Sequence, residues 1–432
     1  MARRILTNLF RLFLRIFFRR IESTGADRVP RASPVIFASN HPNGLIDPLV
    51  LVCGVPREAS FLAKAPLFRT PILSFLVRSF DSIPVYRKQD NMRGTHAETF
   101  SRAREILLRG GSIALFPEGT THSDPMLREL KTGAARIALG ATLDRITIVP
   151  VGIYYTDKQR FRSSVLIAYG EPIEVIPQKP DSYGEPPHLA VDELTQQIDD
   201  GLDRVVLQAD SDAALELIAR AEDIVTATDE QNPQLEYQLR RYFVRGYHYL
   251  RERDPKRLKR LDSRVRQLEA ELSRVGLEVH ELVPVIRPLL ILRLLVSLPL
   301  AAVGAVIHAP AYFFVRLISR RAARGEVEMT ATMKVLASLV LYPLSWIGCA
   351  AAVELLLGWQ AALPALLIQP LLFVLAIRVF EEADDLIGGA RAIFYRVFRS
   401  HGHQRLIAQR EALRDEMLAI GREMQASSPG TQ

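Results

Sequence analysis

Two long apolar runs near the end of the sequence constrain the fold more than any other feature. They extend over residues 335–357 and 361–377, and only the tripeptide GWQ, residues 358–360, separates them. A helix needs about 17 to 25 residues to cross the hydrocarbon core of a bilayer, where lipid cannot hydrogen-bond free backbone groups. The two runs therefore predict a transmembrane helical hairpin.

An earlier apolar run, residues 289–315, is harder to interpret because it contains Arg293, Pro299, His308 and Pro310. It could form a single kinked span or a re-entrant helical pair. Basic segments beside membrane helices are expected on the cytoplasmic side. Keeping the arginine-rich tail on the same side as the amino-terminal part of the chain requires an even number of crossings. This charge pattern favours a re-entrant or interfacial first run.

The composition also points to a membrane. Hydrophobic residues make up 48% of the 432 residues, yet the formal net charge is +7 and the sequence pI is about 9.5. Soluble enzymes seldom combine these properties, which suit a protein held at an anionic lipid surface. A basic excess would also suit nucleic acid, but no helix-turn-helix pattern, zinc spacing or aromatic RNA-binding motif accompanies it. Membrane lipids are therefore expected as partners, and nucleic acid is not.

The sequence opens with MARRILTNLFRLFLRIFFRR, which has the pattern of an amphipathic helix. Arginines interrupt its apolar core and no small-residue cleavage site follows, so it is expected to stay on the mature protein rather than to act as a signal peptide. At helical spacing the arginines share one face, as in a helix lying in the lipid interface. A helix that caps a protein core would share this pattern, but phenylalanines beside so many arginines favour the membrane.

From about Arg31 to Pro177, short β-rich runs such as SPVIFAS, GSIALFPEG and ITIVPVGIYY alternate with helical segments. This alternation predicts an α/β fold in which helices cover a sheet. A proline-rich linker and a charged helical region follow it. The predicted division is an amphipathic interfacial helix over residues 1–28, an α/β domain over 29–180, a helical region over 181–285, a membrane region over 286–380 and a basic helical tail over 381–432.

The segment NHPNGLIDP combines turn-forming residues with a histidine and an aspartate. It follows a predicted strand directly, which places Asn40 and His41 at the carboxyl edge of the sheet, where open α/β sheets bind ligands. Asp47 could accept a hydrogen bond from one imidazole nitrogen and leave the other free to take a proton from a hydroxyl. Alone, the motif fits an Asx-type turn with a surface histidine better than it fits this base with its orienting carboxylate.

A second polar cluster, LFPEGTTHSD, ends another predicted strand with Glu118, Gly119 and Thr120. Glycine lets a backbone approach a ligand closely, and the neighbouring side chains supply polar groups at the same sheet edge. A β-turn explains the segment almost as well. Two cations could bind a phosphate nearby: Lys131, just before a small-residue helix, and Arg87 in IPVYRKQ. Either could equally be an ordinary solvated charge.

A covalent acyl-enzyme has little support in the sequence. It contains no Gly-x-Ser-x-Gly nucleophile elbow. Its two cysteines, Cys53 and Cys349, lie in apolar runs without the partners of a zinc or redox motif, and are expected to be buried thiols. The hydroxyl to be activated is therefore expected to belong to a substrate.

Taken together, NHPNGLIDP, IPVYRKQ, FPEGTTH with LKTGAARIA, and IVPVGI resemble the four conserved blocks of glycerolipid acyltransferases in order and approximate spacing. The resemblance to this family of glycerol-3-phosphate and 1-acylglycerol-3-phosphate acyltransferases covers roughly residues 33–174. It implies that the catalytic pair is His41 and Asp47, with Arg87 at the acceptor phosphate. The residues expected to bind substrate are Asn40, Arg87, Glu118, Gly119, Thr120 and Lys131.

Two departures from the usual pattern are visible. Five residues, Pro42 to Ile46, separate the histidine from the aspartate where most members have four. This longer form resembles a branch with fungal-type glycerol-3-phosphate/dihydroxyacetone-phosphate acyltransferases and bacterial relatives, which carry a helical insert and carboxyl-terminal membrane segments. It puts the usual geometry of the pair in doubt. Tyr86 stands where many members have an acidic residue.

The resemblance implies direct transfer of a fatty acyl group from a thioester donor, acyl-CoA or acyl-carrier protein, to glycerol-3-phosphate in phosphatidic acid biosynthesis. No metal or other cofactor is expected, and the catalytic domain is expected on the cytoplasmic face of the membrane. An alternative acceptor is 1-acylglycerol-3-phosphate. A non-catalytic lipid-binding scaffold is the alternative from another class, although holding a lipid requires no proton acceptor. A soluble hydrolase is a more distant alternative.

Overall fold

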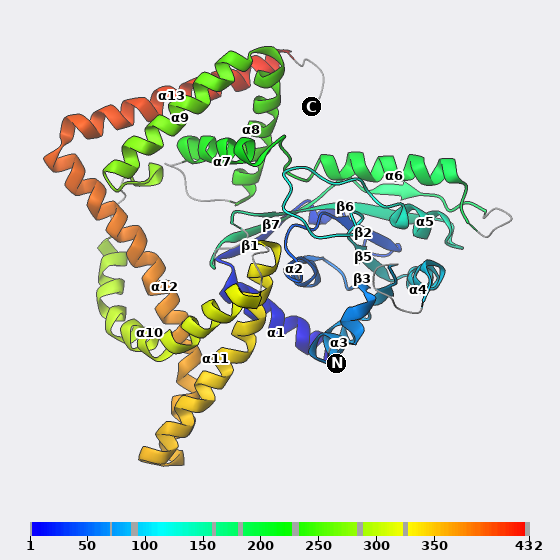
Figure 1. Ribbon diagram of the computed structural model, residues 1–432, viewed down its shortest axis with the longest axis horizontal. Helices are drawn as coiled ribbons and strands as arrows, with labels where there is room; N and C mark the ends of the chain where they lie inside the picture. Colours follow the sequence, from blue (N-terminus) through cyan, green and yellow to red (C-terminus); the bar gives the residue numbers. More distant parts are fainter. Residues whose placement is uncertain are drawn as a thin grey trace. The chain divides into compact units, whose positions relative to one another are not determined.

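The computed structural model describes residues 2–69, 71–87, 94–157, 161–179, 185–226, 233–282, 288–322 and 327–427. The chain divides into two compact units. The first consists of Met1–Gln208 with Glu326–Thr332, and the second of Ala209–Gly325 with Met333–Gln432. The first unit is an α/β structure and the second is helical (Figure 1).

The first unit is built on one sheet. Its strands in the described residues are β1 (Arg20–Thr24), β2 (Val35–Ser39), β3 (Ala59–Lys64), β4 (Ile83–Val85), β5 (Ser112–Leu115), β6 (Ile146–Tyr155), β7 (Ser164–Tyr169) and β8 (Ile173–Val175). They run in the order β1-β7-β6-β2-β5-β3-β4, and β8 pairs with β6. Neighbours are parallel except where β6 meets β7 and β8. The predicted α/β class is confirmed.

Helices cover both faces of this sheet. They are α1 (Ala2–Phe17), α2 (Ile46–Gly54), α3 (Pro71–Ser79), α4 (His96–Leu108), α5 (Gly133–Leu139) and α6 (His188–Asp203). Figure 1 shows α2 and α6 on opposite sides of the sheet. Central strand β2 is buried at every position, as expected for a parallel strand covered on both faces. Strand β2 pairs in parallel with β5 and with β6. The carboxyl ends of these three strands therefore lie side by side at one edge of the sheet.

The amino-terminal helix is shorter than the predicted segment over residues 1–28. It ends at Phe17, because Phe18 turns into the core and is only 1% exposed. Strand β1 then joins the sheet beside β7. Helix α1 has apolar side chains on two faces. Phe10 and Leu14 are buried in the protein. Ile5, Leu9 and Leu12 are exposed.

The first unit also extends beyond the predicted boundary at residue 180. Helix α6 packs against α5 and β6 and buries Val191, Leu194, Ile198 and Leu202. This spacing places the four side chains on one helical face. The first helix of the predicted helical region therefore belongs to the α/β unit, because its apolar stripe completes the cover of the sheet.

The second unit contains a helical bundle formed by α7 (Asp212–Thr226), α8 (Pro233–Arg253), α9 (Pro255–Arg274) and α13 (Ser400–Ser427). Its core includes one side chain from each helix: Ile224, Leu250, Val265 and Leu413. Asp254 caps α9 by accepting a hydrogen bond from the backbone nitrogen of Arg257. Proline at the next position fits the first turn of a helix but would interrupt a longer one, so α8 and α9 form two helices.

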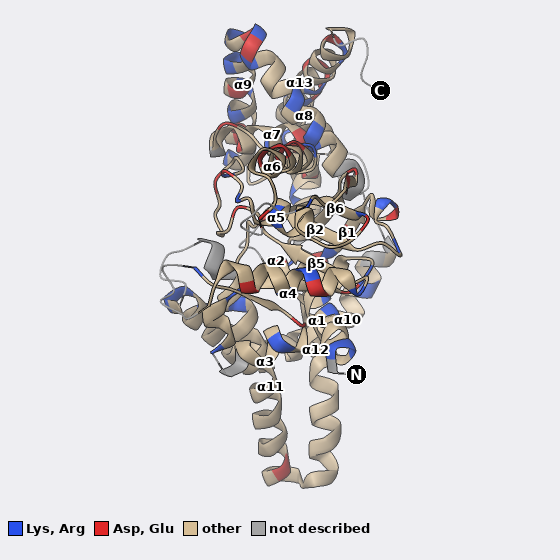
Figure 2. Cartoon of the chain, turned by 90° about the vertical axis from the view of Figure 1, so that its right-hand side faces the viewer, with Lys and Arg blue, Asp and Glu red and all other residues tan. Residues whose placement is uncertain are grey.

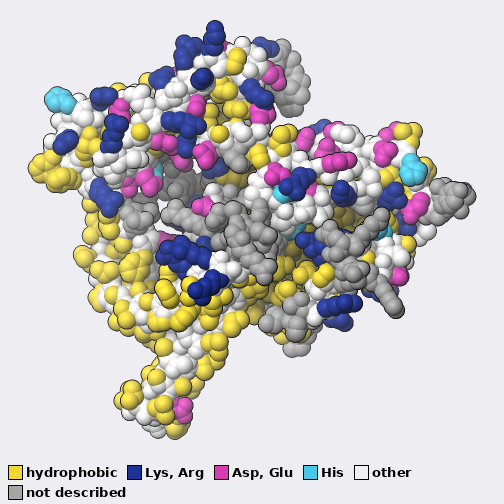
Figure 3. All heavy atoms as spheres, viewed as in Figure 1, with side chains coloured by type: hydrophobic (Ala, Val, Ile, Leu, Met, Phe, Trp, Pro, Cys, Tyr) yellow, Lys and Arg dark blue, Asp and Glu magenta, His cyan; other side chains and the backbone are white. Residues whose placement is uncertain are grey.

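Among the described residues, three helices are long and apolar enough to cross a membrane: α10 (Pro288–Ala322), α11 (Val327–Leu357) and α12 (Trp359–Phe398). Figure 2 shows that the legs of α11 and α12 carry few charged side chains, and Figure 3 shows hydrophobic side chains gathered over these helices. Helices α11 and α12 meet at Gly358, as predicted for the hairpin. Helix α10 packs along α12, where Gly304 allows close approach to the Leu372 backbone.

The re-entrant break favoured for the first apolar run does not occur within residues 288–322. Pro299 and Pro310 both lie inside the unbroken helix α10. Figure 1 shows α10 bending along its length, as expected where proline removes a backbone donor. Packing along α12 keeps the helix continuous across the bend. The number of membrane crossings stays a prediction.

Candidate active site

The candidate site begins with a histidine and an aspartate on either side of one turn. Strand β2 ends at Ser39 and α2 begins at Ile46, with Gly44 between them at a φ of 38°. The imidazole Nδ1 of His41 lies 2.8 Å from Oδ2 of Asp47, whose side chain is fully buried. The structure thus brings the predicted pair together despite the additional residue between them.

Two further donors hold the Asp47 carboxylate. The backbone nitrogen of Asn43 donates to Oδ2 at 2.6 Å, and the Tyr155 hydroxyl donates to Oδ1 at 2.5 Å. Burial, together with the nearby Asp47 charge, raises the pKa of Tyr155 well above its usual value. Tyr155 therefore stays protonated and remains a donor at neutral pH. Both carboxylate oxygens are fixed by hydrogen bonds.

This network assigns the tautomer of His41. An ionised carboxylate can only accept, so the proton of the neutral ring lies on Nδ1 and Nε2 carries the lone pair. No hydrogen-bond partner of Nε2 occurs among the residues that the structure describes. The ring also stacks on Phe116, with centroids 3.9 Å apart and planes 11° apart. The arrangement presents a fixed imidazole with one nitrogen able to accept a proton.

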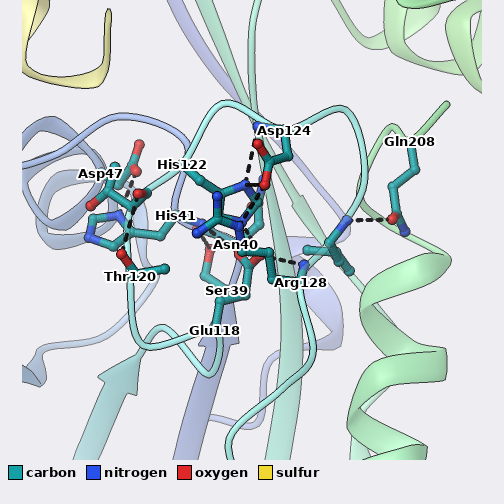
Figure 4. A network of polar contacts seen from close by, with 12 residues as sticks. Ser39, Asn40, His41, Asp47, Glu118, Thr120, His122, Asp124, Arg128 and Gln208 are labelled. Carbon is teal, nitrogen blue, oxygen red and sulfur yellow. Dashed lines mark hydrogen bonds and ion pairs between the residues drawn. The ribbon is translucent and has the colours of Figure 1, made fainter. Parts of the chain in front are cut away.

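Glu118 lies in the loop that follows β5, and its carboxylate points into the protein (Figure 4). It is 3% exposed. Oε1 accepts a hydrogen bond from the backbone nitrogen of His41 at 3.3 Å, and Oε2 accepts one from the backbone nitrogen of Arg128 at 2.9 Å. Nε2 of His122 also pairs with Oε2. Glu118, predicted to bind substrate, is thus surrounded by protein donors.

Asn40, another predicted substrate-binding residue, joins two strands. Its side-chain nitrogen donates to the backbone oxygen of Ile153 at 3.1 Å, and its side-chain oxygen accepts from the backbone nitrogen of Ile153 at 2.7 Å. The carboxamide therefore extends the pairing of β2 with β6 beyond Ser39. This contact sets the position of the chain immediately before His41.

Three more predicted residues lie in the loop after β5. Gly119 has a φ of 73°, a left-handed conformation that favours glycine. The Lys131 stem runs beside it, with Cγ 3.5 Å from the place of a Cβ on Gly119, and the residue is exposed. The Thr120 hydroxyl donates to the backbone oxygen of Thr121 at 3.4 Å. The helix after Lys131, α5, begins at Gly133 and has only seven residues.

Arg87, the predicted phosphate-binding arginine, is half-buried and follows β4 at the edge of the sheet. Strand β4 is three positions from β2 in the strand order. Because the intervening pairs are parallel, Arg87 and His41 lie at the same carboxyl edge. Three strand spacings of about 4.8 Å place the backbones there roughly 14 Å apart.

A cysteine nucleophile receives no support from the described residues. Burial raises the pKa of Cys53 to about 11, although Arg11 opposes the shift. Its sulfur therefore remains a thiol at neutral pH. No group of three or more histidine, cysteine, aspartate or glutamate side chains suited to a metal was found in the described part of the chain.

Sequence reasoning missed three contributors to the site: Phe116, His122 and Tyr155. All three lie in the quoted segments LFPEGTTHSD and ITIVPVGIYY, at the ends of predicted strands. Position at the carboxyl edge was the one signal that could have drawn attention to them. Their contacts with His41, Asp47 and Glu118 depend on strand order, which that signal does not give.

Comparison with known protein families gives a match for the α/β part of the chain and another for the helical part. Residues 20–154 match the family described as Acyltransferase, and residues 226–426 match the one described as Glycerol-3-phosphate acyltransferase 2 C-terminal domain. The chain therefore contains an acyltransferase domain. A region similar to the carboxyl-terminal domain of glycerol-3-phosphate acyltransferase 2 follows this domain. The resemblance to glycerolipid acyltransferases is confirmed.

Relatives with assigned names agree with this. Glycerol-3-phosphate O-acyltransferase 2 of Saccharomyces cerevisiae is 26% identical over 75% of this chain and 47% of its own length. Glycerol-3-phosphate O-acyltransferase 1 of the same yeast is 25% identical over 79% of this chain and 59% of its own length. A 1-acyl-sn-glycerol-3-phosphate acyltransferase of Borreliella burgdorferi is 30% identical over 32% of this chain and 52% of its own length. The chain thus spans between 47% and 59% of these relatives.

Proposed function

We propose that this protein is a membrane-bound O-acyltransferase that moves a fatty acyl group from a thioester to a hydroxyl of glycerol-3-phosphate, in the biosynthesis of phosphatidic acid. The observation that carries the proposal is the His41–Asp47 pair at the carboxyl edge of an acyltransferase domain, with Nδ1 held by the carboxylate and Nε2 available. The names of the yeast relatives support glycerol-3-phosphate as the acceptor.

The reaction follows from the protonation state of His41. Nε2 removes the proton of the acceptor hydroxyl as the hydroxyl oxygen attacks the thioester carbonyl. The tetrahedral intermediate then breaks its carbon–sulfur bond, and the departing thiolate takes the proton back from the imidazolium. Asp47 stabilises the imidazolium while the charge exists. A positioned base supplies roughly 10²- to 10⁴-fold in rate, and alignment of the two substrates contributes as well.

At this edge of the sheet the protein carries positively charged side chains that can bind the phosphate of the acceptor. Arg87 and Lys131 offer positive charge for the acceptor phosphate, as charge-assisted hydrogen bonds to phosphate require. The donor is a thioester of coenzyme A or of an acyl-carrier protein. The chemistry needs no metal or other cofactor, because the base and the leaving thiolate account for every proton moved.

The hydrophobic product explains attachment to the membrane. Exposed apolar residues of α1 alternate with exposed arginines, which suits the interface of anionic lipids. The exposed cations Arg316, Arg320 and Arg321 near the end of α10 favour a cytoplasmic location for that end. We place the catalytic domain on the cytoplasmic face, where acyl thioesters are made available.

The acceptor 1-acylglycerol-3-phosphate is the second candidate, since relatives named for that substrate match the acyltransferase domain. A non-catalytic lipid-binding scaffold is disfavoured by the site itself. A scaffold gains nothing from a buried carboxylate that orients an imidazole.

Membranes containing the protein, supplied with labelled acyl-CoA and either acceptor, test the proposal. We expect label in 1-acylglycerol-3-phosphate when glycerol-3-phosphate is offered. Transfer to neither acceptor, with acyl-carrier protein also tried as donor, would overturn it. The His41→Ala variant should lose transfer and stay in the membrane fraction. His188→Ala, at an exposed histidine of α6, is the matched control and should keep the wild-type rate.

A further inference from the structure

A second histidine lies close to the candidate base without facing the same groups. His122 is 8% exposed and follows Glu118 by four residues in the loop after β5. Its Nδ1 accepts a hydrogen bond from the backbone nitrogen of Asp124 at 3.2 Å. A neutral ring that accepts at Nδ1 carries its proton on Nε2. His122 therefore donates from Nε2 to the Glu118 carboxylate.

The two oxygens of Glu118 divide their contacts. His122 binds Oε2, which also accepts from the backbone nitrogen of Arg128, and the backbone nitrogen of His41 binds Oε1 at 3.3 Å. Two donors on one oxygen stop the carboxylate from rotating about its last bond. The orientation of the other oxygen, which holds His41, follows from this.

The loop after β5 makes two more contacts with His41. The backbone nitrogen of His122 donates to the backbone oxygen of His41 at 3.4 Å. Phe116 stacks on the imidazole. The loop after β5 thus contacts the backbone nitrogen, the backbone oxygen and the ring of His41, while Asp47 contacts Nδ1. Figure 4 shows Asp47, Glu118 and His122 close to His41.

We propose that His122 is a positioning residue for acyl transfer, which locks Glu118 so that Glu118 holds the backbone of His41 in place. This inference rests on the proposed acyl transfer. It makes Glu118 part of the support of the base rather than a ligand of the substrate. His122 acts through Glu118 and touches no reacting atom.

A role for His122 in binding the acceptor phosphate predicts different behaviour. A phosphate ligand would need a cationic ring with a donor directed at the substrate, and both ring nitrogens are engaged by Glu118 and Asp124. Loss of such a ligand would raise the KM for the acceptor. Loss of a positioning contact lowers kcat and leaves that KM unchanged, since a displacement of about 1 Å at a reacting group can cost roughly 100-fold in rate.

A pair of variants with the same side-chain length tests the proposal in the full-length protein. Glutamine at position 122 places an amide nitrogen where Nε2 lies, whereas methionine offers no donor. We expect His122→Met to lower kcat about 10- to 100-fold at an unchanged acceptor KM. His122→Gln should recover most of the loss. His188→Met, at an exposed histidine of the same unit, should match the wild type.

Rates are compared per folded molecule, from thermal unfolding of each variant in detergent. Equal kcat in His122→Met and wild type would overturn the inference, as would a raised acceptor KM that glutamine fails to restore. A loss in both variants that follows their unfolding temperatures would also overturn it, because that pattern indicates a structural role alone. Wild-type transfer is measured first, so failure of the proposed function itself is recognised separately.

Discussion

Two histidines, one in each unit of the protein, show how hydrogen bonding separates a residue available for chemistry from one that holds a structure together. His41 gives Nδ1 to Asp47 and keeps Nε2 available among the described residues. His308, in α10, has both nitrogens engaged: Nδ1 with the backbone oxygen of Gly304 at 2.6 Å, and Nε2 with Nε1 of Trp346 at 2.9 Å. Both residues have the same side chain, but the hydrogen bonds at Nδ1 and Nε2 determine whether a ring nitrogen can accept a proton from a substrate.

The surroundings of the two rings extend the contrast. Around His41 the partners come from the start of α2 and from the end of β5, and they leave Nε2 without a partner among the described residues. Around His308 they come from three long helices, since Gln369 of α12 also donates to the backbone oxygen of Trp346 in α11. The His308 cluster links helices in an apolar region, where a polar group without a partner is costly. It is expected to stabilise the helices and to take no part in transfer.

The strongest test of the comparison is Asp47→Asn. An amide keeps its oxygen at the place of Oδ2, because both Nδ1 of His41 and the backbone nitrogen of Asn43 donate there. It carries no negative charge, so the imidazolium formed during transfer loses its stabilising partner. Without that charge the rate should fall toward the level without base catalysis, which is worth roughly 10²- to 10⁴-fold. The measurement is kcat with labelled acyl-CoA, and exposed Asp144→Asn is the matched control. A rate within the error of wild type would show that the charge of Asp47 does not support the base.

Tyr155→Phe is expected to have a smaller effect, because Asp47 keeps its contact with the Asn43 backbone. Loss of about 1.4 kcal/mol of stabilisation of the charged pair corresponds to a tenfold lower kcat. The free energy of unfolding should fall by about 1.5 to 3 kcal/mol, the range for a hydrogen bond to a charged group. Kinetics and denaturant unfolding measure the two effects, and an unaltered kcat would limit Tyr155 to a structural role.

His308→Leu tests the structural role assigned to His308 in the comparison of the two histidines. The indole nitrogen of Trp346 loses its acceptor, so the free energy of unfolding in detergent should fall by about 1 kcal/mol, as for other polar contacts between membrane helices. Transfer activity per folded molecule should be unchanged. A selective loss of kcat without loss of stability would contradict the structural role of His308.

The smallest effect expected concerns alkaline pH. Because the pKa of Tyr155 lies well above its usual value in the folded protein, the unfolded chain loses this proton first as the pH rises past about 10. The unfolded state is then favoured, so stability falls above that pH and its full value is present below it. Tyr155→Phe should show a shallower decline in unfolding measurements between about pH 9 and 11. Parallel declines in both proteins would exclude this contribution.

Much of the fold could be predicted because local patterns carry it. The helical hairpin of α11 and α12 follows from run length, and the strands around the site follow from apolar runs that end in turn-forming residues. The helix α10 could not be predicted in the same way, since two prolines and an arginine within an apolar run suit several conformations. Packing along α12, at residues distant in sequence, selects one continuous helix.

The contacts of the candidate site also divide into those that local sequence predicts and those that depend on distant segments. His41 and Asp47 lie on either side of one turn, so their contact is local. The motif made the contact possible, and the resemblance of all four blocks to the family predicted it. Asn40 and Glu118 were singled out as substrate-binding residues, yet in the structure their polar groups are engaged by the protein. Sequence reasoning identified their polarity and their place at the sheet edge. Whether they face substrate or protein depends on neighbouring strands.

By itself the sequence determined the class of fold, the apolar helices and the turn that holds an imidazole beside a carboxylate, because each depends on residues close together in the chain. Only the tertiary structure decided which distant groups complete that pair. The order of the strands brings Tyr155 at the end of β6 to Asp47, and the loop after β5 to the backbone of His41. Buried carboxylates need donors, and parallel strands supply them from segments that are far apart in sequence.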